Sequence, residues 1–247
     1  TSRVNSIYVT RDGDKDLSYT TPDAVSAFDT EDNTATHGTH VLGIIAGSND
    51  VQGRYSQYGK NGVQTGTIPY YGVAPDADIV IGCGDFYNEE ILRGVDLVVK
   101  RAKELGKPAV VNLSLGSNVG PHDPNSATSR TLDKLADDAI ICISAGNEGD
   151  SNIALKRPFR GSSIHTFLSP ATIDGAQVLY NAEFWNSTDD TFDLDLVLYN
   201  KSTDKIIEKH TITNLSGRSF TWNGANCPGL KSYYASGAQV YVTSNVD

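Results

Sequence analysis

Three short apolar runs, rich in β-branched residues, constrain the fold of this chain more than any other feature of its sequence. They cover residues 78–83, 109–113 and 139–143. Residues 91–105 carry apolar positions at three- and four-residue spacings, which predicts an amphipathic helix with Asn88 as its cap and Gly106 at its end. A second helix is expected over 126–137. Strands that alternate with helices and are apolar on both faces are typical of a parallel sheet covered by helices, so residues 1–150 are expected to form an α/β domain.

The period of the pattern changes after Asp150. Apolar and polar residues alternate over 192–198, which predicts a strand with one solvated face. Similar short runs, separated by turn residues, cover residues 176–184, 206–212, 219–222 and 239–242. Residues 151–247 are therefore expected to form a separate antiparallel β-sandwich domain.

Composition excludes several classes of protein. Of the 247 residues, 38% are hydrophobic and 20% charged, as in soluble globular proteins. No apolar stretch approaches the ~18 residues that a membrane span requires. Acids outnumber bases 30 to 20, and the net charge of −10 argues against a nucleic-acid partner. The chain contains no Met and opens on a polar stretch without a signal peptide, so we expect a processed product or a piece of a longer protein. The sequence predicts no oligomeric state.

The cysteines indicate neither a zinc site nor a disulfide framework. Cys83, Cys142 and Cys227 are isolated, odd in number, and form no CxxC pair. Because Cys83 and Cys142 lie in apolar runs, both are expected to be buried as small hydrophobic side chains.

An acidic segment near the start of the chain partly resembles a calcium-binding loop. Its carboxylates belong to Asp12, Asp14, Asp16 and Asp23. Leu17 stands where such a loop has Gly, and the last ligand is Asp instead of Glu. No cofactor and no metal ligand are therefore assigned, and structural calcium stays an alternative to a plain acidic loop. Residues 11–14 are expected to form a hairpin turn.

The stretch HGTHVLGIIAG, residues 37–47, is the most informative part of the sequence. It predicts a helix with His37 exposed at its start, where a neutral imidazole is able to take a proton from a hydroxyl near neutral pH. Gly43 and Gly47 are expected to let a neighbouring backbone come close. A lone histidine is more often an ordinary surface or core residue, and His37 with His40 lacks the Glu of an HExxH zinc site.

Residues 37–43 resemble the HGTHVAG signature around the catalytic histidine of the subtilisin-like serine proteases. Three further segments follow in that family's order and are similar to its GVAP segment, its NMSLG strand and its AAGNEG loop: residues 72–77, 111–116 and 144–149. The resemblance covers roughly residues 29–150. It implies the three-layer α/β fold of that family and hydrolysis of peptide bonds in a peptide or protein substrate by a Ser-His-Asp mechanism.

The resemblance also implies roles for individual residues. His37 would be the general base, and the side-chain amide of Asn147 would help form the oxyanion hole. The implied substrate-binding residues, which pair with the substrate backbone or line the primary specificity pocket, are Ser114, Leu115, Gly116 and Gly146. His40 matches no catalytic position. The segment 48–71, rich in Gly, Asn and Gln, is expected to be a loop beside the substrate groove.

Two parts of the family pattern are missing from these residues. There is no GTSxS motif for the serine, and the nearest match to the DSG or DTG turn of the aspartate is Asp12-Gly13, which fits a hairpin turn better. We therefore expect an inactive fragment of a secreted or cell-envelope serine endopeptidase, whose Ser and Asp lie outside this chain. Residues 151–247 weakly resemble the jelly-roll insertions of some larger bacterial members. The alternatives are a pseudoprotease that binds or regulates a partner, or a β-sandwich binding module.

Overall fold

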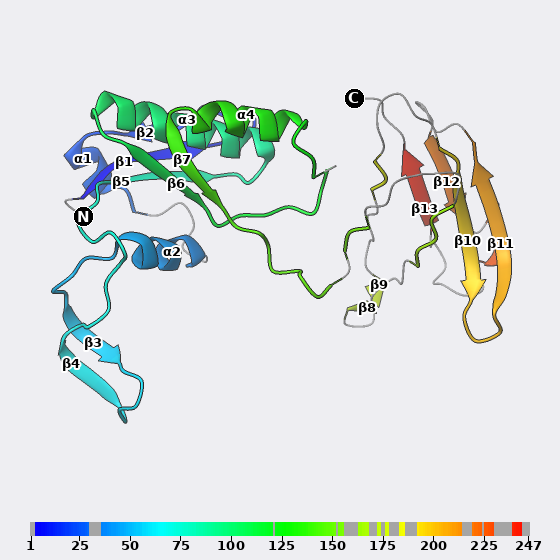
Figure 1. Cartoon of the computed structure of the whole chain (residues 1–247), viewed down its shortest axis with the longest axis horizontal. Coiled ribbons are helices and arrows are strands. Elements are labelled where there is room, and N and C mark those ends of the chain that lie inside the picture. Colours follow the sequence, from blue (N-terminus) through cyan, green and yellow to red (C-terminus); the bar gives the residue numbers. More distant parts are fainter. Residues whose placement is uncertain are drawn as a thin grey trace. The chain divides into compact units, whose positions relative to one another are not determined.

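The computed structural model describes residues 3–29, 36–120, 122–151, 153–155, 163–167, 172–173, 176–177, 183–185, 192–213, 219–223, 225–229 and 239–243. By its internal contacts the chain divides into two compact units. The first comprises Thr1–Asn118 and His122–Ala154, and the second Val119–Pro121 and Leu155–Asp247. Both are drawn in Figure 1.

The first unit begins with a three-stranded sheet in the order β2-β1-β5. Its strands are β1 (Val4–Thr10), β2 (Leu17–Tyr19) and β5 (Ile79–Gly84). β1 runs parallel to β5 and antiparallel to β2. The apolar centre of β1 is buried, with Val9 fully inaccessible. Gly13 has a φ of +71° in the turn between β1 and β2, which confirms the hairpin turn predicted for residues 11–14.

A second pair of parallel strands follows along the chain and carries two helices. Its elements are α3 (Asn88–Glu104), β6 (Ala109–Leu113), α4 (Ala127–Ala136) and β7 (Ala139–Ile143). β6 and β7 pair in register from Ala109 opposite Ala139 to Leu113 opposite Ile143. Side chains of α3, α4 and the two strands form one apolar cluster around Val95, Val99 and Val111. The expected α/β alternation of this part of the chain is thus confirmed.

The ends of α3 show one correct and one wrong prediction. Gly106 has a φ of +63° and its N–H bonds to the carbonyl of Lys103, so the helix ends as predicted. Asn88 is the first helical residue and not the cap, because Tyr87 holds the extended backbone of the N-cap position.

Only one face of β6 and β7 is covered within the described residues. In Figure 1, α3 and α4 lie together on one side of these strands. On the other face, Val110 is 68% exposed and its partner Ile140 is 65% exposed. Cys142 shares that face and is exposed, so its predicted burial is wrong, and Cys83 is only half-buried. The expectation of helices on both faces does not hold for this pair of strands.

Two helices and a hairpin complete the first unit. They are α1 (Pro22–Ala27), α2 (His37–Ala46), β3 (Gln52–Ser56) and β4 (Val63–Thr67). α2 begins at His37, and this residue is exposed, as predicted. β3 and β4 pair antiparallel from Gln52 opposite Thr67 to Ser56 opposite Val63. The expected loop over 48–71 is therefore wrong, because the segment contains this β-hairpin.

The described part of the second unit is built from antiparallel strand pairs. They are β8 (Thr172–Ile173) with β9 (Ala176–Gln177), β10 (Leu194–Asn200) with β11 (Lys205–Ile212), and β12 (Ser219–Asn223) with β13 (Gln239–Thr243). Leu198 of β10 and Trp222 of β12 are buried in one cluster with Cys227. Side chains from two different strand pairs therefore share a core.

Among the described residues of both units, every helix is too short or too polar to cross a membrane.

Candidate active site

The carboxyl ends of β6 and β7 bring two of the sequence motifs together. The N–H of Ser144, just after β7, donates to the carbonyl of Leu113 at 3.0 Å. The hydroxyl of Ser144 donates to the carbonyl of Leu115 at 2.7 Å. The backbone of Ser114 and Leu115 is thereby held against the start of the loop that leads to Asn147. Neighbouring parallel strands end at one edge of a sheet, and open α/β folds bind ligands at that edge.

The segment 114–116 continues beyond the last paired residue of β6. The hydroxyl of Ser114 accepts a hydrogen bond from the side-chain amide of Asn112 at 3.0 Å. Ser114 and Leu115 are half-buried, and Gly116 is exposed. A segment that directly follows a strand suits the addition of a peptide strand.

The loop at Asn147 is held by a hydrogen bond between Asn147 and the next residue, Glu148. Gly146 has a φ of +87°, and the N–H of Asn147 donates to Oε2 of Glu148 at 2.8 Å. A Cβ on Gly146 would lie 2.9 Å from that carboxylate oxygen, so the turn favours glycine for two reasons. Asn147 is exposed, and its side-chain amide makes no hydrogen bond within the described residues. The amide therefore has free donors to offer a ligand.

The helix that presents His37 is anchored at its opposite end. The N–H groups of Val73 and Ala74 donate to the last carbonyls of α2, those of Ile44 and Ile45, at 3.0 and 2.8 Å. The Arg3 guanidinium donates to the carbonyl of Ala46 at 2.5 Å. The segment that resembles the family's GVAP motif thus caps α2 instead of merely connecting it to β5.

Glycines permit this close contact, as expected for one of the two predicted positions. A Cβ on Gly47 would lie 2.5 Å from the carbonyl oxygen of Gly43 and 3.3 Å from the backbone nitrogen of Gly72. The prediction for Gly47 is confirmed. The prediction for Gly43 is wrong, because a Cβ there would meet no atom within 4 Å.

Within the described residues, the imidazole of His37 makes no hydrogen bond or ion pair. The structure joins Ser114 and Leu115 to the loop before Asn147, whereas no described interaction joins His37 to either motif. That His37 and Asn147 face one groove therefore stays a prediction.

An arginine that the sequence analysis missed organises the acidic segment. The guanidinium of Arg93 on α3 donates to both carboxylate oxygens of Asp16, each at 3.1 Å, and to Glu90 at 3.1 Å and the carbonyl of Arg11 at 3.0 Å. The hydrogen bonds between Asp16 and Arg93 lower the pKa of Asp16 and raise the pKa of Arg93. The spacing of Glu90 and Arg93, three positions apart on a helix, was the available signal.

This arrangement argues against the calcium loop. The Asp16 carboxylate is bonded to Arg93, and the N–H of Asp12 donates to the carboxylate of Asp85 at 2.9 Å. Within the described part of the chain, no three acidic, histidine or cysteine side chains gather in a way that would hold a metal ion. The ion pair with Arg93 accounts for the carboxylate of Asp16.

Comparison with known proteins gives a consistent result. The profile of the subtilase family matches residues 6–230. Over 123 residues the chain is 29% identical to the intracellular serine protease of Paenibacillus polymyxa. This match covers 47% of the chain and 30% of that protein. Over 128 residues the chain is 30% identical to the minor extracellular protease Vpr of Bacillus subtilis strain 168. This match covers 49% of the chain and 13% of that protein.

Among solved structures, the Clostridium perfringens CspB protease matches with a TM-score of 0.45 and 26% sequence identity, covering 60% of this chain and 31% of that one. The chain spans less than a third of the length of the curated relatives that it matches.

Proposed function

Because this chain belongs to the subtilase family, we propose that it is part of a serine endopeptidase that cleaves peptide or protein substrates. The observation that carries the proposal is the family match over residues 6–230, most of the chain. Two curated relatives, named as serine or extracellular proteases, are consistent with it.

In this proposal His37 is the general base. Its imidazole takes the proton of a serine hydroxyl as the oxygen attacks the scissile carbonyl, and then gives that proton to the leaving amine. The exposure of His37 at the start of α2, without a hydrogen-bond partner among the described residues, supports this role. A histidine bonded to its own scaffold would be less available to a hydroxyl.

Asn147 supplies a donor to the oxyanion in the same proposal. Its side-chain amide would bind the negative charge that develops on the carbonyl oxygen in the transition state. The backbone of Ser114, Leu115 and Gly116 would pair with the extended substrate, and Gly146 would form the far wall of the pocket for the primary side chain. The hydrogen bonds from Ser144 to Leu113 and Leu115 support this grouping.

The serine and aspartate of the triad would come from polypeptide outside these 247 residues. A base and an oxyanion donor without a nucleophile form no acyl-enzyme. The chain alone is therefore proposed to be inactive.

Residues 151–247 are proposed to be a β-sandwich inserted into the catalytic domain. Antiparallel strand pairs with a core shared by Leu198 and Trp222 support a sandwich. A family match that runs on to residue 230 supports an insertion within the domain.

Secretion, or attachment to the cell envelope, is proposed for the whole protein. The name of Vpr is consistent with secretion, and that of the Paenibacillus relative points to the opposite location. Fractionation of the source cells, with detection of the protein in the medium, tests this part of the proposal.

The test of the function is a peptidase assay on the full-length gene product. His37→Ala is expected to lower kcat by at least about 10²–10⁴-fold, because the serine loses its proton acceptor. His40→Ala, an exposed histidine in the same helix, serves as the matched control and is expected to retain activity. Equal activities of the two variants would overturn the assignment of His37. A full-length protein without peptidase activity would favour the pseudoprotease.

A further inference from the structure

The guanidinium of Arg3 joins segments that lie far apart in the sequence. It donates to the carbonyl of Ala46 at the end of α2 at 2.5 Å, to the hydroxyl of Ser48 at 2.9 Å, and to the carbonyl of Ala77, just before β5, at 2.9 Å. The backbone carbonyl of Arg3 accepts from the N–H of Ile79, the first residue of β5, at 2.8 Å. One residue thus connects the end of α2, the segment before β5 and the first sheet.

The C-terminal end of α2 depends on groups outside the helix. The last turn of α2 contains no basic residue, and Ala46 is buried, with 4% of its surface exposed. A buried carbonyl without a hydrogen bond costs free energy. A cation at this end of a helix is favourable, because the unbonded carbonyls carry the negative part of the helix dipole. Arg3 supplies both the donor and the positive charge.

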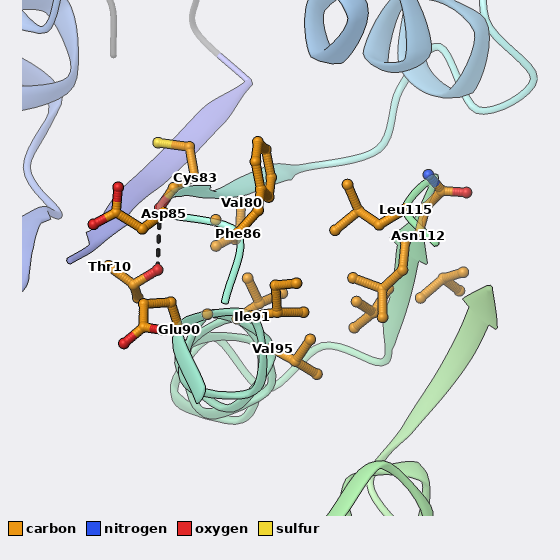
Figure 2. A pocket seen from close by; sticks show the side chains of 16 residues that line it. Thr10, Val80, Cys83, Asp85, Phe86, Glu90, Ile91, Val95, Asn112 and Leu115 are labelled. Atoms are coloured by element: carbon orange, nitrogen blue, oxygen red, sulfur yellow. Dashed lines mark hydrogen bonds between the residues drawn. The ribbon is translucent and has the colours of Figure 1, made fainter. Parts of the chain in front are cut away.

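The sheet next to Arg3 is a firm base. β1 begins directly after Arg3 and pairs parallel with β5 from Val4 to Thr10. Figure 2 shows the other end of these strands, where the hydroxyl of Thr10 donates to the carbonyl of Cys83 at 3.3 Å. Within the described residues, no other hydrogen bond or ion pair joins α2 to this sheet. The hydrogen-bonded link between the helix and the sheet therefore runs through Arg3.

His37 stands at the opposite end of the same helix. The ten residues of α2 span about 15 Å, so a tilt of about 4° moves the far end by about 1 Å. Thr36, in the N-cap position, makes no side-chain cap hydrogen bond, and the imidazole of His37 makes none within the described part of the chain. The start of α2 has no such anchor of its own, so its position follows from how the other end is held.

We propose that Arg3 is a positioning residue for His37. By fixing the C-terminal end of α2 to the first sheet, Arg3 sets the direction of the helix and thus the place of the imidazole. The inference rests on the proposed function in taking His37 as the general base. Arginine suits this role because its planar fork of N–H donors reaches two carbonyls and a hydroxyl at once, whereas lysine presents its donors on a single nitrogen.

Hydrogen exchange of the full-length protein tests whether Arg3 holds the helix. In Arg3→Gln the amides of residues 41–47 are expected to exchange about tenfold faster or more, because the helix end loses a hydrogen bond to a charged group. Arg3→Lys keeps the charge but donates from one nitrogen, and its exchange is expected to fall between that of Arg3→Gln and that of the parent protein. Any other order of the three proteins overturns the proposal.

The amides of β6 and β7 serve as the internal control for folding in the same experiment. They are expected to exchange equally in all three proteins, because neither strand contacts Arg3 through a hydrogen bond within the described residues. If they exchange faster in Arg3→Gln, that variant is misfolded, and Arg3→Lys is compared with the parent protein instead. Equal exchange of residues 41–47 in those two proteins then overturns the proposal.

The peptidase assay gives a second readout. Arg3→Gln is expected to lower kcat per folded molecule by about 10–10²-fold, because a shift of about 1 Å in a catalytic group is enough for such a loss. KM is expected to stay unchanged, since the proposed substrate-binding segment 114–116 lies on another element. A purely structural role would lower only the folded fraction, measured by circular dichroism. Arg130→Gln is the matched control and is expected to change neither quantity, because the exposed Arg130 side chain on α4 makes no hydrogen bond within the described residues.

The two assays separate this inference from the proposed function. If the full-length protein lacks peptidase activity, the proposed function fails, and the exchange of residues 41–47 decides whether Arg3 positions the helix. If His37→Ala abolishes activity while Arg3→Gln keeps kcat per folded molecule, His37 stays the general base and Arg3 is not a positioning residue.

Discussion

Gly47 and Gly72 set how closely the C-terminal end of α2 approaches the segment before β5. The N–H of Gly72 donates to the carbonyl of Gly47 at 2.9 Å, and a Cβ on Gly72 would lie 2.5 Å from the backbone nitrogen of Ala46. Neither position has room for a side chain. The helix that begins at His37 is thus fixed at its far end by close backbone contacts, together with the hydrogen bond from Arg3 to Ala46.

Substitution of Gly47 by alanine is expected to lower the free energy of unfolding by about 1–3 kcal/mol, because the new methyl group overpacks a backbone contact. Gly43→Ala is the matched control in the same helix, where open space and better helix propensity predict a gain of up to about 1 kcal/mol. Urea unfolding of chain 1–247 measures both. Equal stabilities would show that the close approach does not constrain α2.

Asp16 makes stability depend on pH. Its pKa in the folded state is lowered, mainly by hydrogen bonding to Arg93. Its contribution to the free energy of unfolding is therefore present above the unfolded-state pKa of about 3.9 and is lost as the pH falls through the lower folded-state pKa. Asp16→Asn is therefore expected to flatten the loss of stability in acid. Asp14→Asn, in the same turn, is the control. Denaturant unfolding between pH 6 and 3 measures the free energy of unfolding of each variant. If both variants lost this free energy with falling pH as steeply as the parent chain, the assignment would be contradicted.

At the scale of elements, the sequence predicted strands and helices well where an apolar run is bounded by capping or turn residues. β6 and β7 have the predicted bounds, and α4 lies within the predicted range, because β-branched runs and the Ser126 cap are local signals. The β3–β4 hairpin was missed, since its strands alternate half-buried with exposed residues and contain glycines that weaken any strand pattern.

The burial of whole faces was less predictable than the elements themselves. Cys142 lies in an apolar run, yet whether a strand face is covered depends on elements distant in sequence. The sequence signal is the same for both faces of β6 and β7, so it does not distinguish the face against α3 from the exposed one.

Adjacent valines on β6 test this assignment of faces. Val111 is 6% exposed and packs against α3, so Val111→Ala is expected to cost about 1–3 kcal/mol through lost burial and a cavity. Val110 is 68% exposed, and Val110→Ala is expected to change stability by less than about 0.5 kcal/mol. Thermal or urea unfolding of chain 1–247 compares them, and a reversed order would mean that the faces are misassigned.

At the scale of the whole molecule, the candidate site depends on how separate elements meet. That Ser114 and Leu115 lie beside the loop of Asn147 was predictable, because both motifs follow neighbouring parallel strands. The place of His37 was not, because α2 lies outside the sheet and its position depends on side-chain and backbone packing that no local pattern encodes.

A crystal structure of the full-length protein with a peptide boronate bound tests the central claim most directly. The account predicts a serine–boron bond, with the imidazole of His37 about 2.6–3.2 Å from one boronate oxygen or the serine oxygen. It also predicts the side-chain amide of Asn147 about 2.7–3.1 Å from the oxygen that mimics the oxyanion. A boronate bound elsewhere, or bound with His37 and Asn147 turned away from it, would contradict the account.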